Sequence, residues 1–476
     1  MVLSIIHEKE FYTLYRDSDT DEEVYYIKKL TDPQEIKKAD EIATEFKKKF
    51  MVVNLLHLKK EFQQYKKWIK EAADKKGLNS ENFPALLTHV LSKVCTSLGI
   101  TPFMLDPDIE DLQVFGYDKP VLVTLPEYGS CITNVFFNEE KKEIESIIEN
   151  LLRGHNVVMS FSNPIVDISL SDGSRLNATY PPISPGGPTI SIRKFKEMPI
   201  TVSDLINKGQ LTVDAAALLW MYMSGLQTVP INMVVAGGVG SGKTSLLNLL
   251  TLFIPNEEVL LTIEETREVS PQTQNVITLV SRPHGLESTG RITQDDLLRA
   301  SLRKNPDRII IGEMRGEEAA SLFSAMNVGR KCLTTIHANS SEEVITRLSN
   351  PPMNVPRELI GLLDVVILMV RIIDEGKIKR RILQISEILQ EEDNKYKINH
   401  IYRWDSPTDT LKKINEPMKI KKIAEYLGVD ENKVVEDLKE RENILSSISK
   451  KSLPISEIKK ILEKHNKEAR NKIRKN

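Results

Sequence analysis

Short apolar runs alternate with longer segments of helical spacing through the second half of the chain. Short, continuous apolar runs are typical of buried strands, and apolar residues every three or four positions are typical of amphipathic helices. The pattern predicts strands at 231–236, 259–263, 276–280, 308–311, 332–336 and 365–370. It predicts helices at 215–223, 295–303, 317–327 and 342–348, and another after Gly242. Such alternation favours an α/β fold, with a mostly parallel sheet covered by helices on both faces.

The first part of the chain has a different pattern. Residues 1–80 are rich in lysine and have helical spacing at 36–50 and 58–73, which predicts a helical N-terminal extension. Its lysines form either solvated helix faces or a basic surface for a partner or for acidic lipid head groups. Residues 81–196 combine helical patterns with short alternating runs, and we expect an α+β N-terminal domain there.

The remaining boundaries follow from changes in composition. Residues 197–212 are predicted to be a linker, and residues 213–390 the main α/β domain. Residues 391–476 are more polar, and we expect a helical C-terminal appendage with helices at 418–427, 431–445 and 456–467. A partly ordered tail is the alternative for this last region.

Composition excludes several classes of protein. The 476 residues include 65 Lys and Arg and 67 Asp and Glu, so no global charge attracts the chain to nucleic acid or anionic lipid. Cys95, Cys131 and Cys332 are widely spaced, which argues against a disulfide framework or a zinc site and for a reducing compartment. The apolar stretch 360–373 is interrupted by charges and is shorter than the ~20 residues that span a bilayer. We therefore expect a soluble cytosolic protein that reaches a membrane only through a partner.

A phosphate-binding loop is the strongest single motif. A Gly-x4-Gly-Lys-Thr sequence stands between the strand at 231–236 and a predicted helix, the context that defines a P-loop. Glycines allow the backbone amides to approach a triphosphate, and the helix adds its positive N-terminal end. Lys243 is expected to bind the β- and γ-phosphates of the nucleotide, ATP. The Thr244 hydroxyl is expected to be a ligand of Mg²⁺. The candidate nucleotide-binding residues of this loop are Gly237, Gly238, Val239, Gly240, Ser241, Gly242, Lys243, Thr244 and Ser245.

Three other predicted strands end in polar side chains. In a parallel sheet these strand ends meet at the edge that carries the P-loop. Glu313 follows the strand at 308–311 and could orient or deprotonate the attacking water near Mg²⁺. Glu264 and Glu265 close another strand, where either could position water or complete the second shell of Mg²⁺, and His337 is a candidate γ-phosphate sensor or proton carrier. The alternatives are a surface glutamate, an isolated acidic strand end and a histidine that serves in packing.

Arginines between the two acidic strands are candidates for a transition-state contact. Arg282, Arg299 and Arg303 could reach a phosphate in the same subunit or across an interface. For any single one of them, we favour the alternative, an ordinary surface pair.

These motifs together resemble the type II/IV secretion ATPase superfamily, which drives secretion systems, type IV pili and archaella. The P-loop, Thr-Ile-Glu-Glu-Thr-Arg-Glu, Ile-Ile-Ile-Gly-Glu-Met-Arg-Gly and Thr-Thr-Ile-His-Ala-Asn are similar to its Walker A, Asp-box, Walker B and His-box. Asp172-Gly173-Ser174-Arg175-Leu176 and Ile192-Arg193-Lys194-Phe195 resemble its N-terminal domain. The run at 351–356 and the tail around 404–405 look most like archaeal members.

The resemblance implies a RecA-like ATPase domain and a homohexameric ring. ATP would bind between the N- and C-terminal domains, with Arg193 approaching from the N-terminal domain. Glu313 would be the catalytic carboxylate, and Glu264, Glu265 and His337 accessory groups. The ring would act on a membrane platform protein at the inner face of the cell membrane and drive pilin-like subunits.

Two departures from the family pattern stand out. Glu265 replaces the usual aspartate of the Asp-box, and Gly329-Arg330 replaces the usual Gly-His before the His-box. The four-cysteine zinc site of some members is absent from the sequence. Other functions compatible with a P-loop are pilus retraction, nucleic-acid translocation and an inactive nucleotide-sensing scaffold. The near-neutral charge and the lack of an aromatic-interleaved basic groove argue against nucleic acid.

Overall fold

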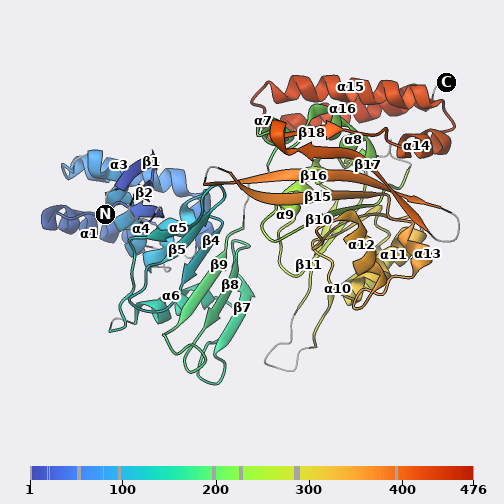
Figure 1. Ribbon diagram of the computed structural model, residues 1–476. Helices are drawn as coiled ribbons and strands as arrows, with labels where there is room; N and C mark the ends of the chain where they lie inside the picture. Colours follow the sequence, from blue (N-terminus) through green and yellow to red (C-terminus); the bar gives the residue numbers. More distant parts are fainter. Residues whose placement is uncertain are drawn as a thin grey trace. The chain divides into compact units, whose positions relative to one another are not determined.

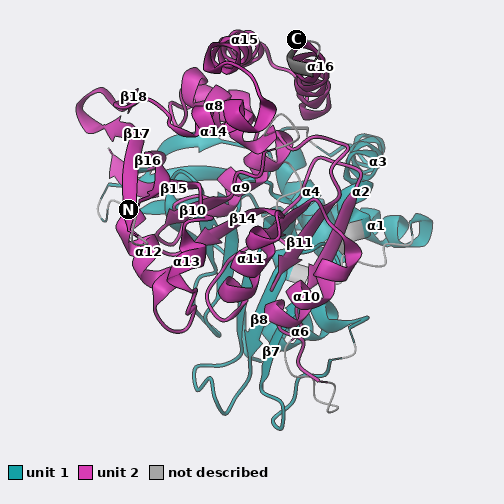
Figure 2. Ribbon diagram, turned by 90° about the vertical axis from the view of Figure 1, so that its right-hand side faces the viewer, with its two compact units in different colours: residues 1–196, 375–378 teal, residues 197–374, 379–476 magenta. Residues whose placement is uncertain are grey.

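The computed structural model describes residues 3–474 apart from 19, 21, 51–54, 79, 95–97, 141, 156, 196–199, 225–228, 283–289, 375 and 392–394. The chain divides into two compact units, coloured separately in Figure 2. Unit 1 comprises residues 1–196 and 375–378, and unit 2 comprises residues 197–374 and 379–476. Cys131 and Cys332 are buried free thiols, and Cys95 lies outside the described residues. Among the residues described, no helix is both long and apolar enough to cross a membrane.

Unit 1 contains a nine-stranded sheet in the order β1-β2-β3-β6-β5-β4-β9-β8-β7 (Figure 1). Its strands are β1 (Leu3–Glu8), β2 (Tyr12–Asp17), β3 (Glu23–Ile27), β4 (Asp111–Val114), β5 (Leu122–Leu125), β6 (Gly129–Thr133), β7 (Ile165–Ser169), β8 (Arg175–Thr179) and β9 (Thr189–Arg193). Its helices are α1 (Pro33–Lys49), α2 (Leu55–Lys60), α3 (Phe62–Lys75), α4 (Phe83–Val94), α5 (Thr101–Leu105) and α6 (Glu143–Leu152). Helix and sheet residues share one hydrophobic core, as expected for an α+β unit.

The prediction of a purely helical N-terminal extension is wrong for its first part. The helices expected at 36–50 and 58–73 are present as α1 and α3, but three strands precede them. Tyr12 and Tyr25 are buried and their rings stack with centroids 4.0 Å apart. β3 also pairs in parallel with β6, a strand that the sequence pattern did not predict. β6 lies more than one hundred residues further along the chain than β3, so the local spacing of apolar residues could not reveal this pairing.

Unit 2 contains a second nine-stranded sheet, in the order β12-β11-β13-β14-β10-β15-β16-β17-β18. Its strands are β10 (Met233–Gly237), β11 (Leu260–Glu264), β12 (Val276–Val280), β13 (Arg308–Ile311), β14 (Lys331–Ile336), β15 (Val365–Asp374), β16 (Lys377–Gln390), β17 (Tyr396–Asp405) and β18 (Thr410–Lys413). Neighbours from β12 to β15 pair in parallel, whereas β16, β17 and β18 pair antiparallel. The predicted mostly parallel α/β sheet is confirmed.

Helices cover both faces of this sheet. Alternate residues of β10 divide between two cores: Met233 and Val235 belong to one, Val234 and Ala236 to the other. On the first face lie α7 (Val202–Asn207), α8 (Val213–Ser224), α9 (Lys243–Leu252), α14 (Lys419–Leu427), α15 (Glu431–Ser449) and α16 (Ile455–Arg474). On the second lie α10 (Gln294–Ser301), α11 (Glu318–Asn327), α12 (Ser341–Ser349) and α13 (Arg357–Ile360).

Two boundaries differ from the expected ones. Residues 202–207 of the expected linker form α7, which begins with a capping box in which Thr201 and Asp204 exchange hydrogen bonds. Residues 396–413 of the expected helical appendage form β17 and β18, which extend the sheet. These strands carry many charged residues on their solvent side, so their sequence lacks the apolar run of a buried strand.

The three C-terminal helices are present where the sequence predicted them, and they share the core of unit 2. Trp220 of α8 anchors them: its indole N–H donates to Asn466 Oδ1 at 3.1 Å, and the Arg441 guanidinium lies 4.5 Å from its ring centroid. Arg441 donates to Asp437 Oδ2 at 2.6 Å, and His465 Nε2 lies 2.9 Å from Asp437 Oδ1. These contacts join α8, α15 and α16 through buried polar groups.

This network generates a stability prediction. The change Asp437→Asn removes the counter-charge of the fully buried Arg441, so we expect unit 2 to lose about 3 kcal/mol of stability. The matched control is Glu436→Gln, an exposed glutamate on the same helix, which should cost less than about 1 kcal/mol. Urea unfolding of the full chain, followed by circular dichroism, measures both. Equal losses for the two variants would contradict the proposed role of Asp437.

Candidate functional site

The P-loop connects β10 to α9 in a conformation that only glycine adopts easily. Gly240 and Gly242 have φ values of +71° and +94°, and Gly242 caps the N-terminus of α9. A Cβ atom on Gly237 would lie 2.5 Å from the carbonyl oxygen of Met369 on β15. The predicted strand, glycine turn and helix are therefore all present, with the positive end of α9 at the turn.

Lys243 lies at the centre of the loop. Its Nζ donates to the carbonyl oxygens of Gly237 and Gly238 at 3.0 and 2.9 Å, and lies 3.4 Å from His337 Nδ1. Burial lowers the pKa of the Lys243 ammonium, while the negative charge of Glu313 acts in the opposite direction. A bound phosphate would replace the carbonyls as the partner of this amine.

The polar strand ends meet at the same edge because their strands are parallel. Glu313 follows β13 and His337 follows β14, and His337 Nε2 lies 2.7 Å from Glu313 Oε1. Burial, followed by the charge of Lys243, lowers the pKa of His337, so the imidazole is neutral at pH 7. Lys243, His337 and Glu313 thus form one continuous chain of contacts from the P-loop to the expected catalytic carboxylate.

Glu264 and Glu265, adjacent in sequence, lie in opposite environments. Glu264 ends β11 and is buried, and its Oε1 accepts hydrogen bonds from the backbone N–H groups of Glu268 and Val269 at 2.9 and 2.8 Å. Its Oε2 is buried and has no hydrogen-bond partner among the described residues. Glu265 is exposed, with its carboxylate 3.8 Å from Arg315. Of the two glutamates, Glu264 therefore has the environment better suited to contact with a further polar group, through its Oε2.

The other predicted residues are more exposed. Thr244 stands in the first turn of α9, half-buried, and Ser245 is exposed beside it. Arg282 donates to the carbonyl oxygen of Gly290 at 3.0 Å, and Arg303 is exposed in the turn after α10. Within the part of the chain that is described, no hydrogen bond or ion pair joins Arg282 or Arg303 to the P-loop or to Glu313.

Arg193 belongs to unit 1. It ends β9, where its Nε donates to Asp111 Oδ1 on β4 at 3.0 Å. Its approach to the nucleotide stays a prediction.

Two arginines of the site were missed by the sequence analysis. Arg315 contacts Glu313 Oε2 at 2.5 Å, and Arg380 on β16 donates to the carbonyl oxygen of Gly240 at 3.0 Å. Arg315 stands two residues after Glu313, within a motif already noticed, so that spacing could have indicated it. Nothing in the local sequence indicated Arg380, because β16 returns beside the P-loop only in the folded sheet.

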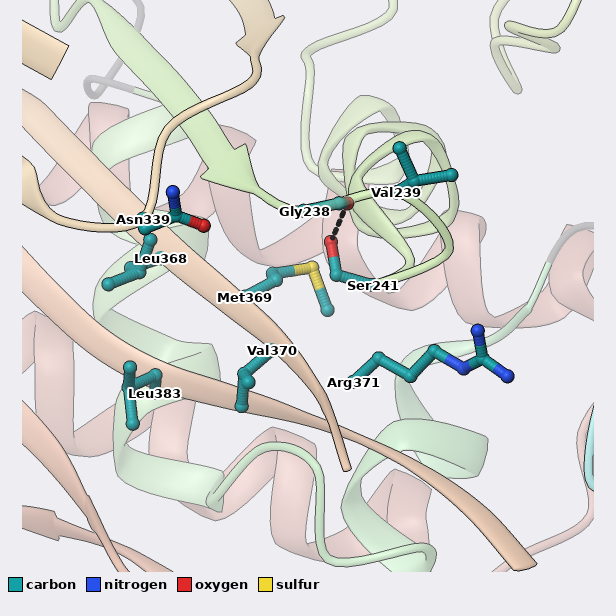
Figure 3. Close-up of a pocket in the computed structure, with 9 residues that line it drawn as sticks. All are labelled: Gly238, Val239, Ser241, Asn339, Leu368, Met369, Val370, Arg371 and Leu383. Carbon is teal, nitrogen blue, oxygen red and sulfur yellow. Dashed lines mark hydrogen bonds between the residues drawn. The ribbon is translucent and has the colours of Figure 1, made fainter. Parts of the chain in front are cut away.

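A cavity of about 380 Å³ adjoins the P-loop (Figure 3). Gly238, Val239 and Ser241 line one side of it, and Met369 and Arg371 of β15 another. The Ser241 hydroxyl donates to the Gly238 carbonyl oxygen at 2.9 Å and closes the loop, as the dashed line in Figure 3 shows. The P-loop therefore lies beside β15, and the Lys243 amine that follows it contacts His337.

The buried carboxyl group of Glu264 generates a pH prediction. Burial raises its pKa to about 7 in the folded chain, against an ordinary value of 4.5. The folded state then binds more protons than the unfolded state between these values, so stability is full below pH 4.5 and falls as the pH rises through 7. The parent protein should lose about 2–3 kcal/mol of folding stability between pH 5 and pH 8 because of this group. We expect this loss to be absent in Glu264→Gln.

Urea unfolding at several pH values without nucleotide measures this effect. The Gln side chain keeps an oxygen for the N–H groups of Glu268 and Val269, so the loop should stay intact. Parallel stability curves for the variant and the parent protein would contradict a buried, titrating Glu264. The variant Glu265→Gln, on an exposed neighbour, is the control.

Comparison with known proteins identifies the family to which the sequence is similar. Residues 141–462 match the family described as "Type II/IV secretion system protein". An uncharacterized Methanocaldococcus jannaschii protein is 33% identical over 368 residues, 76% of this chain and 66% of the relative. The Bordetella pertussis type IV secretion system protein PtlH is 30% identical over 253 residues, 47% of this chain and 74% of that protein.

The chain spans just under two thirds of the first relative, at 66%, and 32% of another Methanocaldococcus jannaschii relative. The solved structure of the pilus retraction motor PilT with bound ADP has 17% identity and a TM-score of 0.41, over 73% of this chain and 87% of that one. The family match itself covers more than half of the present chain. The chain therefore belongs to the type II/IV secretion system protein family.

Proposed function

We propose that this protein is a Mg²⁺-dependent ATPase that powers protein secretion or the assembly of a pilus-like filament. The observation that carries the proposal is the chain of contacts Lys243–His337–Glu313 beside a complete P-loop. Each neighbouring pair in it is joined at 3.4 Å or less. Family membership supports the secretion role, and the name of PtlH places that relative in a type IV secretion system.

The residues present fit ATP and Mg²⁺. The glycine loop presents backbone N–H groups and the N-terminus of α9 to an anion, and Lys243 supplies a positive charge at its centre. Mg²⁺ prefers oxygen ligands and would neutralise charge on the β- and γ-phosphates; the Thr244 hydroxyl, with Glu313 in a second shell, would hold it.

In this proposal Glu313 acts on the attacking water. In the reaction, water oxygen bonds to the terminal phosphorus, and the bond to the bridging oxygen breaks with its electron pair passing to ADP. The water proton passes to the Glu313 carboxylate, which accepts a hydrogen bond from Arg315 and lies 2.7 Å from His337 Nε2. The neutral His337 keeps one nitrogen toward Lys243, so it can register whether that amine is engaged by a phosphate.

The first prediction here concerns catalysis. Glu313→Gln keeps the size of the side chain but removes its basicity, so kcat for ATP should fall about 100-fold or more. The dissociation constant for ATP should change by less than about threefold, because Lys243 and the loop are untouched. Glu317→Gln, an exposed carboxylate four residues further along, is the control and should keep full activity. Parent-like turnover in Glu313→Gln would overturn the proposed role.

The second prediction concerns assembly and tests the finer part of the proposal. A homohexamer, acting on a membrane platform protein, is what the family resemblance implies. In Glu313→Gln with ATP and Mg²⁺, mass photometry should show a species of about six times the 54.0 kDa chain mass. A chain that hydrolyses ATP but stays monomeric at every nucleotide and protein concentration tested would contradict the ring.

A further inference from the structure

A second cavity, of about 360 Å³, has His337 among its lining residues. Half of its ten lining residues are apolar, and the other five are polar or cationic, contributed by the segments after β13 and β14 and by α12 and its C-terminal end. They are Arg315, His337, Thr346, Arg347 and Asn350. His337 and Arg315 therefore line this cavity and also contact Glu313 of the candidate site.

The cavity lies on the opposite face of the sheet from the P-loop helix. Leu246 and Leu247 of α9 pack in the core on one face, together with Met233 of β10. Met314 and Met353, which line the cavity, pack in the core on the other face. His337 connects the two places, because it contacts Lys243 of the P-loop and also lines the cavity.

The chemistry of the lining suits a tetrahedral oxyanion. Arg347 uses its Nε to donate to Glu343 Oε1 at 2.8 Å, and its two terminal nitrogens make no hydrogen bond within the described residues. Glu343 is held in turn by the backbone N–H and side-chain amide of Asn339, at 2.7 and 3.1 Å. This fixes the Arg347 stem and leaves two charged donors available, the arrangement in which a guanidinium binds phosphate oxygens in pairs.

We propose that this cavity receives the inorganic phosphate produced by ATP hydrolysis and is its route of release. The inference rests on the proposed ATPase function. In-line transfer moves the cleaved phosphoryl group away from ADP, which here means toward Glu313 and His337 and then to Arg315 and Arg347. Phosphate can then leave on one face of the sheet while ADP remains bound at the other.

Inorganic phosphate as an inhibitor of the full-length protein tests this route. The variants Arg347→Gln and Asn350→Asp respectively remove a positive charge and add a negative one, and Asn350→Asp leaves the Arg347–Glu343 pair intact. Both should raise the inhibition constant of phosphate by about fivefold or more, as expected for loss of one charge-assisted contact. The KM for ATP and the single-turnover cleavage rate should stay within about twofold. Arg403→Gln, an exposed arginine on β17, is the matched control.

The outcomes separate this inference from the proposed function. Unchanged phosphate inhibition in both variants overturns the cavity as a phosphate site, and so does a KM for ATP that rises in parallel, which would place Arg347 in the triphosphate site. A parent protein without ATP hydrolysis overturns the proposed function instead. In that case ³¹P NMR line broadening of inorganic phosphate by the nucleotide-free chain still tests the cavity, and loss of broadening in Arg347→Gln but not in Arg403→Gln supports it.

Discussion

The contact between the Lys243 amine, the His337 imidazole and the Glu313 carboxylate is the interaction on which the candidate site depends. It exists because three parallel strands, β10, β14 and β13, lie side by side and end at one edge. Their registers align Val235 with Thr335 and Ile310 with Leu333, so the residues that follow each strand emerge at similar heights. A shift of register in either ladder would separate the three groups.

Burial lowers the pKa of two of these groups, Lys243 and His337. Little water reaches Lys243, and its charge together with burial keeps His337 neutral. Burial has the opposite effect on Glu264, one strand further along the sheet, because it raises the pKa of this carboxyl group and favours its protonated form. Its Cγ would lie only 3.0 Å from a Cβ on Gly312, so the glycine before Glu313 is the residue that admits it. Packing and protonation are therefore coupled at this edge.

The sheet also separates the P-loop from the cavity lined by Arg315 and Arg347. α9 and the C-terminal helices cover one face, and α10 to α13 cover the other, so anything that crosses the carboxyl edge passes between two independent cores. The P-loop lies on the side of α9, and Arg315 and Arg347 line a cavity on the other side. In the proposed reaction the nucleotide and the cleaved phosphate therefore have different neighbours, while β15 and β16 brace the loop through Met369 and Arg380.

The sequence alone determined the local features: the P-loop and its helix, the parallel strands from β10 to β15, and the polar residues Glu264, Glu313 and His337 at their ends. These follow from short-range patterns, because strand ends and glycine turns are encoded by neighbouring residues. Only the tertiary structure decided what depends on distant partners. It paired β3 with β6, turned 396–413 into strands of the main sheet, and joined α15 and α16 to Trp220 through Arg441. It also distinguished buried Glu264 from exposed Glu265, two glutamates that local sequence could not tell apart, because burial is a property of the whole packed chain.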